Sequence, residues 1–246
     1  MSLKSKKILG ISVTIENKDT ILEYIRKYLE KSSEKPMVIA TPNPEQIVAA
    51  QSDLLFAEIL NQADVSLPDG IGLALAMGIK RIPGVEFMEN LVKLAAIRGY
   101  PIGLIGGRGN IAVEALECLS REAGLRGWAF DPGNVDLGNL GNLGDLREKI
   151  QKTNAKIVFV GLGAPKQEFF IHALQKACLM SPVACRSFIL MSVGGAFDII
   201  AGRTPRAPRA MQAFGLEWLW RLLREPWRFR RQRALLKFLW LLASKG

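Results

Sequence analysis

The sequence predicts an α/β protein whose parallel sheet carries helices on both faces. Along most of the 246 residues, short apolar segments of strand length alternate with segments whose apolar residues recur at helical spacing. Short apolar strands separated by helices are typical of parallel pairing with both faces of the sheet covered. Hydrophobic residues form 49% of the chain, which is ample for such a core.

The expected elements follow one another in a regular order. Residues 8–15 read as a strand and residues 19–31 as an amphipathic helix with apolar Ile21, Ile25 and Leu29. Residues 37–41 read as a buried strand, and Pro44 suits the first turn of a helix at 44–51. The other expected strands are 64–67, 102–105, 127–130, 157–160 and 188–193, and the other expected helices are 54–61, 71–77, 85–98, 110–122, 143–152 and 165–178.

Stretches rich in glycine, asparagine and proline separate these elements. Residues 131–144 are rich in Gly and Asn, which predicts a loop. Gly202, Pro205 and Pro208 predict a linker at residues 201–208. We therefore expect a catalytic domain at residues 1–200 and a basic helical appendage at residues 201–246.

Residues 203–246 carry almost the whole charge imbalance of the chain. They hold nine Arg and two Lys against Glu217 and Glu225, which accounts for +9 of the net charge of +10. Four of the five Trp also lie there. A near-neutral body with a basic, Trp-rich end predicts binding to an anionic surface. Three kinds of surface fit this pattern: a bilayer, a nucleic acid or a phosphorylated substrate.

Two helices are expected in this appendage, at 214–223 and 226–242, broken at Pro226. In the second, basic and apolar residues fall on different faces: Arg230, Arg233 and Lys237 on one, and Leu235, Phe238, Leu239 and Leu242 on another. This pattern favours a membrane surface over packing on the protein's own domain or on a partner subunit. Nucleic-acid binding is the weakest interpretation, because the apolar face is wide and no nucleic-acid-binding motif is present.

The expected compartment is the cytoplasm, with attachment to a membrane surface. No apolar run approaches the ~20 residues of a spanning helix, and the N-terminal residues lack the apolar region of a signal peptide. Cys118, Cys178 and Cys185 form no C-x-x-C pair, which fits reduced thiols. The oligomeric state stays open, since apolar helices can also bury against another subunit.

Polar residues and glycines follow five of the expected strands at their carboxyl ends, where an open parallel sheet binds ligands. Gly106-Gly107 and Gly161-x-Gly163 would let a backbone approach phosphate oxygens, with a helix N-terminus behind each. The remaining groups are Thr41 with Asn43, Asp69 with Gly70, Gln167 with Glu168, and Gly194-Gly195 with Asp198.

Several of these residues have two interpretations. Asp69 is either a general base or the N-cap of the next helix. Thr41 and Asn43 either bind hydroxyl groups or cap the helix that begins at Pro44. His172 is interpreted as a structural residue, because no second His exists for a metal site or a triad.

Motifs for common nucleotide cofactors are incomplete. The chain has neither the full G-x-G-x-x-G fingerprint nor a Walker lysine–serine pair, so a dinucleotide or ATP site is disfavoured, and with it an NAD-dependent oxidoreductase. No Asp-x-Asp pair is present to hold a metal on a nucleotide diphosphate. We therefore expect no cofactor and metal-independent chemistry, in which helix ends and arginines neutralise phosphate. A non-catalytic nucleotide- or nucleic-acid-binding module is the alternative from another class.

Taken together, the motifs resemble the WecG/TagA/CpsF glycosyltransferase family over about residues 8–228. The segments that carry the resemblance are Thr41-Pro-Asn43-Pro-Glu-Gln, Asp69-Gly70, Gly106-Gly107, Gly161-Leu-Gly-Ala-Pro-Lys-Gln167-Glu168, Gly194-Gly195-x-Phe-Asp198, Arg206-Ala-Pro-Arg209 and Gly215-Leu-Glu217-Trp218-x-x-Arg221. Glu86 is a departure, since aspartate is expected there.

The resemblance implies a Rossmann-like fold with a membrane-associating C-terminal appendage. It implies an inverting transferase that moves N-acetylmannosamine, or its uronic acid or glucose in some members, from a UDP-sugar to a polyprenyl-diphosphate-linked sugar. Asp69 would be the base, and Thr41 and Asn43 would position sugars. Gln167, with Glu168 beside it, would lie in the substrate pocket. Stabilisation of the diphosphate would fall to four arginines: Arg206, Arg209, Arg221 and Arg224.

Overall fold

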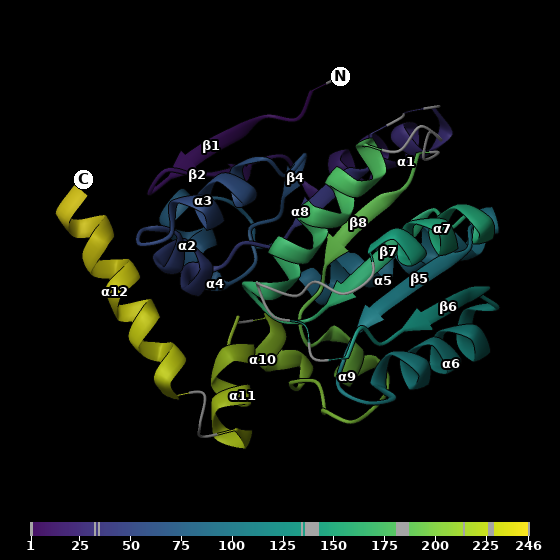
Figure 1. Ribbon diagram of the computed structural model, residues 1–246. Helices are drawn as coiled ribbons and strands as arrows, with labels where there is room; N and C mark the ends of the chain where they lie inside the picture. Colours follow the sequence, from purple (N-terminus) through teal and green to yellow (C-terminus); the bar gives the residue numbers. More distant parts are fainter. Residues whose placement is uncertain are drawn as a thin grey trace.

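The protein is built on a six-stranded sheet in which every strand is parallel to its neighbours (Figure 1). The computed structural model describes residues 2–31, 33, 35–133, 135, 143–180, 187–213, 215–225 and 229–245. The strands lie in the order β4-β3-β8-β7-β5-β6, with β3 (Met37–Ala40), β4 (Val65–Ser66), β5 (Ile102–Gly106), β6 (Gly127–Phe130), β7 (Ile157–Gly161) and β8 (Ile189–Ser192). The predicted parallel α/β class is confirmed.

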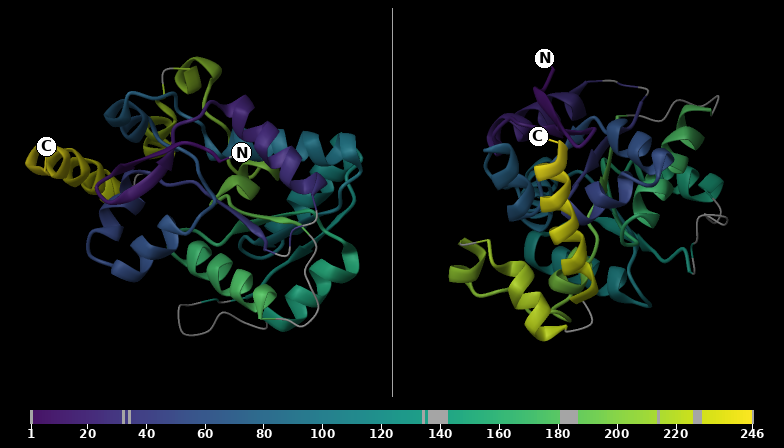
Figure 2. Two further views of the ribbon diagram at one scale, coloured as in Figure 1. Left: turned by 90° about the horizontal axis from the view of Figure 1, so that it is seen from above. Right: turned by 90° about the vertical axis from the view of Figure 1, so that its left-hand side faces the viewer.

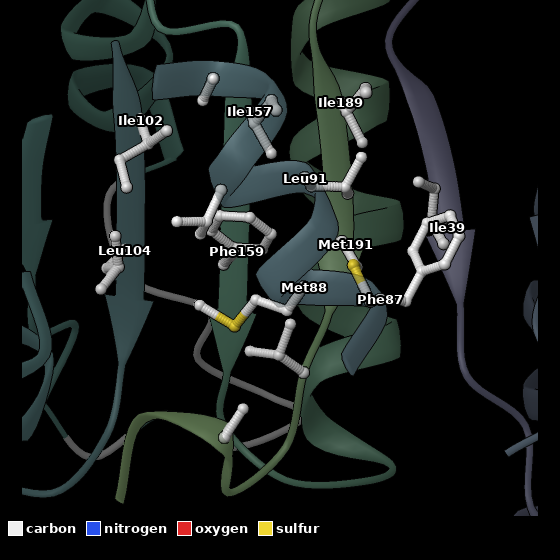
Figure 3. Packing of buried hydrophobic residues seen from close by; sticks show 14 of the residues in the cluster. Ile39, Phe87, Met88, Leu91, Ile102, Leu104, Ile157, Phe159, Ile189 and Met191 are labelled. Atoms are coloured by element: carbon white, nitrogen blue, oxygen red, sulfur yellow. The ribbon is translucent and has the colours of Figure 1, made fainter. Parts of the chain in front are cut away.

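Helices cover both faces of this sheet, because successive strand residues point to opposite sides. On one face, Leu104, Phe159 and Met191 pack in a single cluster (Figure 3) with α1 (Lys18–Glu30), α5 (Gly84–Arg98), α6 (Ile111–Ala123) and α9 (Ala196–Ile200). On the other face, Ile105 and Val158 pack with α7 (Leu143–Thr153) and α8 (Lys166–Leu179). The predicted two-sided covering is confirmed.

A third hydrophobic cluster lies at the β4 side of the molecule. It joins a small hairpin, made of β1 (Ser5–Ile8) and β2 (Ile11–Thr14), to α2 (Pro44–Ala50), α3 (Leu54–Asn61), α4 (Ile71–Met77) and α12 (Phe229–Lys245). Phe238 and Leu241 of α12 are buried in this cluster, and α12 runs along α2 (Figures 1 and 2). The C-terminal helix therefore packs on the protein's own domain.

The N-terminal segment differs from its prediction. Residues 8–15 were expected to form one strand, but β1 and β2 pair antiparallel in a separate two-stranded sheet. Leu9 and Gly10 form the turn with φ values of 48° and 82°, as a tight two-residue hairpin requires. Gly10 adopts this conformation readily, whereas an apolar residue such as Leu9 gives no turn signal. The sequence pattern therefore predicted one continuous strand and no hairpin.

The appendage also differs from its predicted helix boundaries. Helix α11 (Glu217–Arg224) stands where the helix at 214–223 was expected. A further short helix, α10 (Arg209–Ala213), was not predicted, and Gly215 with φ +69° lies between the two. The last helix begins at Phe229 rather than 226. Short α9 was not predicted. Phe214, residues 226–228, Cys185 and most of the predicted loop 131–144 lie outside the described residues.

The outer face of α12 carries apolar and basic side chains together. Leu236, Leu239 and Trp240 are 69%, 51% and 65% exposed, although Leu239 was expected on the same face as Phe238. Arg233 and Lys237 are exposed as well. Across the described ranges, no helix has the length and apolar character needed to span a membrane.

Candidate active site

The strand order sets five polar loops side by side along one edge of the sheet. In a parallel sheet the carboxyl ends of all strands meet at the same edge. Asp69, Thr41 and Gly194 lie in the loops after β4, β3 and β8, and Gly161 and Gly106 are the last residues of β7 and β5. This is also the order of these strands across the sheet. Helices α9, α10 and α11 lie on this side of the molecule (Figure 1).

The Asp69 turn is held against the loop that follows β3. The Asp69 amide donates to Pro42 O at 3.1 Å and to Leu67 O at 2.8 Å. A Cβ atom on Gly70 would lie 3.2 Å from Pro44 Cδ and 3.8 Å from Asn43 Cβ. Gly70, with φ +99°, is the N-cap residue of α4 and supplies no side-chain hydrogen bond. The helix-cap alternative for Asp69 is therefore wrong.

Thr41 and Asp69 converge on the start of α5. A Cβ atom on Gly84 would lie 3.1 Å from Thr41 Cγ2 and 3.6 Å from Asp69 Oδ2, so a larger residue there would crowd both side chains. The Thr41 hydroxyl donates to Ser192 O at 3.4 Å, which ties it to the end of β8. Thr41 is buried, whereas the Asp69 side chain keeps 31% of its surface exposed.

Asn43 caps α2 in a capping box. Its Oδ1 accepts from the Gln46 amide at 3.1 Å, and its own amide donates to Gln46 Oε1 at 3.2 Å. The capping interpretation of Asn43 is confirmed. A role in binding a sugar stays a prediction.

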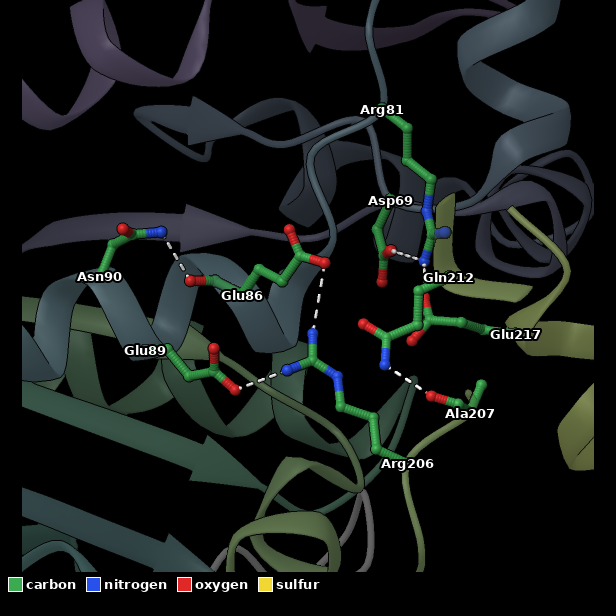
Figure 4. Close-up of polar contacts among 9 residues, drawn as sticks. All are labelled: Asp69, Arg81, Glu86, Glu89, Asn90, Arg206, Ala207, Gln212 and Glu217. Carbon is green, nitrogen blue, oxygen red and sulfur yellow. Dashed lines mark hydrogen bonds and ion pairs between the residues drawn. The ribbon is translucent and has the colours of Figure 1, made fainter. Parts of the chain in front are cut away.

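Arg81 places a guanidinium group between Asp69 and the C-terminal appendage (Figure 4). It lies in the loop between α4 and α5, with Nη2 3.9 Å from Asp69 Oδ1, and it also bonds to Glu217 Oε2 of α11. Arg81 and Glu217 are both largely buried, with side-chain exposures of 16% and 19%. Arg81 is not among the residues predicted from the sequence, although it falls just before the Gly84-Val-Glu86 segment.

Arg206 attaches the linker of the appendage to α5. Its guanidinium donates to Glu89 Oε1 at 2.8 Å and to Glu86 Oε1 at 3.2 Å (Figure 4). The glutamate at position 86, where the family resemblance leads us to expect aspartate, thus reaches Arg206. Arg203 makes a similar double contact with Glu114 of α6, at 2.6 and 2.8 Å. These ion pairs, with that of Glu217, bring the appendage to the carboxyl edge of the sheet.

Fewer contacts are described for the other three arginines that were predicted to bind diphosphate. Arg224 is exposed in the last turn of α11, and its guanidinium lies 4.8 Å from the centre of the Trp220 ring. Arg209 is the first residue of α10, and Arg221 lies within α11. The side chains of both are outside the described part of the structure. Within the contact set of Figure 4, two arginines thus meet four carboxylates: Arg81 with Asp69 and Glu217, and Arg206 with Glu86 and Glu89.

The glycines at the ends of β5 and β7 pack against each other. The Gly107 amide donates to Gly161 O at 2.9 Å. A Cβ atom on Gly106 would lie 2.7 Å from Leu162 Cδ2, and one on Gly161 would lie 2.8 Å from the Phe197 ring. Close loop packing alone explains glycine at 106 and 161. Gly163, with φ +76°, has no described atom within 4 Å of such a Cβ, so packing among the described residues does not require glycine there.

Gln167 and Glu168 are buried below this edge. Gln167 Oε1 accepts from the Gly194 amide at 3.0 Å, and its Nε2 donates to Glu168 Oε1 at 2.8 Å. Burial raises the pKa of Glu168 to about 7. Both residues were expected beside the substrate, yet only 3% and 4% of their surfaces are exposed.

A cavity between β3, β8, α3 and α8 lies next to Glu168. Its lining includes Ser192, Gln175 and His172 together with apolar residues of β3 and α3. Burial lowers the pKa of His172, which is partly exposed, as expected for a structural residue. The described part of the chain contains no group of three or more His, Cys, Asp or Glu side chains arranged to hold a metal ion.

The fold and this edge define a doubly wound α/β protein, a class whose members bind ligands where the strands end. There, an accessible carboxylate faces a buried guanidinium group, and the C-terminal segment closes over one side. The chain belongs to the glycosyl transferase WecG/TagA/CpsF family, whose model it matches over residues 6–246. It is therefore a glycosyltransferase, and the resemblance inferred from its motifs is confirmed.

Proposed function

We propose that this glycosyltransferase moves N-acetylmannosamine from a UDP-sugar to a polyprenyl-diphosphate-linked sugar, with inversion at the anomeric carbon. The reaction would serve the synthesis of a cell-wall polymer such as teichoic acid, or of another surface polysaccharide. The observation that carries the proposal is the Asp69 carboxylate beside Arg81, at the carboxyl edge of the sheet, in a chain of this family.

In this mechanism Asp69 acts as the general base. It accepts the proton of the acceptor hydroxyl while the hydroxyl oxygen attacks the anomeric carbon of the donor sugar. The bond from that carbon to the UDP oxygen breaks on the opposite face, and its electron pair leaves with the diphosphate. The partial exposure of Asp69 supports this role, because an acceptor must reach the carboxylate.

Positive charge at the leaving diphosphate would come from Arg81 and from the arginines of the appendage. Arg81 is a strong candidate because its Nε is buried and has no partner among the described residues. Its present partner Glu217 belongs to the appendage, so a diphosphate that binds Arg81 would compete with Glu217. We extend this role to Arg206, and to Arg209, Arg221 and Arg224 as further candidates.

We propose that residues 201–246 form an appendage that holds the enzyme on the cytoplasmic face of an anionic membrane. The support is the net charge of +9 on residues 203–246 and the outer face of α12. On that face, Leu236, Leu239 and Trp240 are exposed together with Arg233 and Lys237. A lipid-linked acceptor requires the active site to stand close to such a surface, and basic residues near it add ~1 kcal/mol each.

A transfer assay tests the proposed reaction. The purified protein is incubated with a polyprenyl-diphosphate-linked N-acetylglucosamine and, in parallel, with UDP-N-acetylmannosamine, UDP-N-acetylmannosaminuronic acid or UDP-glucose. We expect the fastest transfer from UDP-N-acetylmannosamine, and a product of inverted anomeric configuration by NMR. Faster transfer of another sugar would replace the donor, and a retained configuration would overturn the base mechanism.

A further inference from the structure

Glu168 joins three of the strand-end loops although it lies below the surface of the site. Its Oε1 accepts from Gln46 Nε2 and from Gln167 Nε2, both at 2.8 Å. Gln46 belongs to the first turn of α2, after β3, and Gln167 to the first turn of α8, after β7. One carboxyl oxygen thus fixes the orientation of two amide side chains from different elements.

Each of these amides uses its other end to hold a loop. Gln46 Oε1 accepts from the Asn43 amide, and the same loop contributes Pro42 O, which accepts from the Asp69 amide at 3.1 Å. Gln167 Oε1 accepts from the Gly194 amide at 3.0 Å. The contacts therefore run from Glu168 through Gln46 to the Asp69 turn, and through Gln167 to the loop after β8.

The chemistry of this cluster suits a carboxylic acid rather than a carboxylate. Only 4% of the residue's surface is exposed, its two side-chain donors are neutral amides, and no described cation forms an ion pair with it. The second oxygen, Oε2, is buried without a partner among the described residues. A neutral acid avoids the cost of a buried, unpaired charge, and it keeps Oε1 as an acceptor for both amides.

We propose that Glu168 is a positioning residue for the transferase site: through Gln46 and Gln167 it fixes the loops that carry Asn43, Asp69 and Gly194, and it does not contact the sugar nucleotide. The proposal rests on the proposed function of Asp69. Because small displacements of a catalytic group cost large factors in rate, releasing the loop before Asp69 lowers turnover more than it lowers donor binding.

Three substitutions separate positioning from a merely structural role. Glu168→Gln keeps the acceptor oxygen in a neutral group, and Glu168→Leu removes it and leaves two buried amides without an acceptor. Gln175→Leu is the matched control, because Gln175 is another buried amide of α8, and it donates to Pro36 O at the amino end of β3, away from the site. For each variant, kcat, donor KM, UDP affinity and the hydrogen exchange of the Asp69 amide are measured.

We expect Glu168→Gln to retain kcat within about threefold. We expect Glu168→Leu to lower kcat at least about tenfold with UDP affinity changed less than about threefold, and to speed exchange of the Asp69 amide at least about tenfold. Gln175→Leu is expected to lower thermal stability without changing kcat or that exchange rate. Equal kcat for Glu168→Leu and wild type, or a loss in Glu168→Gln as large as in Glu168→Leu, would overturn the proposal.

A second variant covers the case in which Glu168→Leu does not fold. Gln46→Leu removes the hydrogen bonds that link Glu168 to the loop of Asn43, but it leaves the Glu168–Gln167 hydrogen bond in place. It is expected to lower kcat and to speed hydrogen exchange of the Asp69 amide in the same way. Unchanged values for both would overturn the proposal. The exchange measurement needs no substrate, so it decides the role of Glu168 even if the transfer assay rejects the proposed reaction.

Discussion

The buried acid at position 168 makes the stability of this protein depend on pH. Burial raises the pKa of Glu168 from its ordinary value of 4.5 to about 7 in the folded chain. Between these values the folded state holds a proton that the unfolded state has released, so its contribution to stability is full below pH 4.5 and falls as pH rises through 7. The difference corresponds to about 3 kcal/mol.

Glu168→Gln removes this dependence, because the amide does not titrate. The free energy of unfolding is measured by urea titration with Trp fluorescence at four pH values from 5 to 8. We expect the stability of wild type, relative to Glu168→Gln, to fall by about 2 to 3 kcal/mol across this range. The comparison cancels most contributions of other groups, because both chains carry them.

Nearby titratable groups set the control. His172 lines the same cavity, with Glu58 of α3 and Lys176 of α8 near it. Burial lowers the pKa of His172, so its own contribution has the opposite sign and increases as pH rises. The experiment is repeated in a His172→Gln background, where the wild-type-minus-Glu168→Gln difference is expected to persist. If the free energy of unfolding of the chain with Glu168 runs parallel to that of the Glu168→Gln chain across this pH range, with either residue at position 172, a buried Glu168 that carries a proton is refuted.

Three further predictions concern the site, the loops and the appendage. Arg81→Ala is expected to lower kcat/KM by about 10²-fold, as loss of a charge-stabilising donor does, and a wild-type value would remove Arg81 from the site. Gly106→Ala is expected to cost about 2 kcal/mol or more in chemical denaturation, because its Cβ would meet neighbouring atoms at 2.7 Å. Gly109→Ala, also at positive φ but with no described atom within 4 Å of its Cβ, is expected to cost about 1 kcal/mol, and equal costs would contradict the packing argument. The double variant Leu236→Ser, Trp240→Ser is expected to bind anionic liposomes at least about tenfold more weakly at unchanged thermal stability, and undiminished sedimentation would show that this face is not the membrane contact.

The sheet and most helices were predictable because their signals are local. Short, fully apolar segments such as 157–160 predict strands that are buried on both faces. Pro44 after Asn43 predicts the start of a helix. The sites of disagreement are those where a local signal is absent or ambiguous. The turn at Leu9 is one example, since only the pairing of β1 with β2 reveals it.

The appendage shows the limit of periodicity. Phe238 and Leu235 form an apolar stripe that suits a bilayer as well as a protein surface. The structure buries Phe238 against α2 and sets Leu235 Cδ1 close to Gly72 of α4, at 3.1 Å from the position of a Cβ there. The sequence cannot distinguish these two environments, because both remove the same apolar area from water.

The site itself was predictable as a set of strand ends but not as a set of contacts. Asp69 and Thr41 fall in register because the strands are parallel, which sequence order alone implies. Arg81 and Glu217 are 136 residues apart, and no spacing rule brings them together. Glu168 was expected in the substrate pocket beside Gln167, and only the folded chain supplies the two amides that make its burial acceptable.

The central claim is that the Asp69 carboxylate removes the proton of the acceptor hydroxyl. Asp69→Asn keeps the size of the side chain and removes its basicity, and Asp19→Asn, an exposed substitution in the first turn of α1, is the matched control. We expect single-turnover transfer from bound UDP-sugar to slow by about 10² to 10⁴-fold in Asp69→Asn, with UDP affinity unchanged, and to stay at the wild-type rate in Asp19→Asn. Transfer by Asp69→Asn at the wild-type rate would contradict the account.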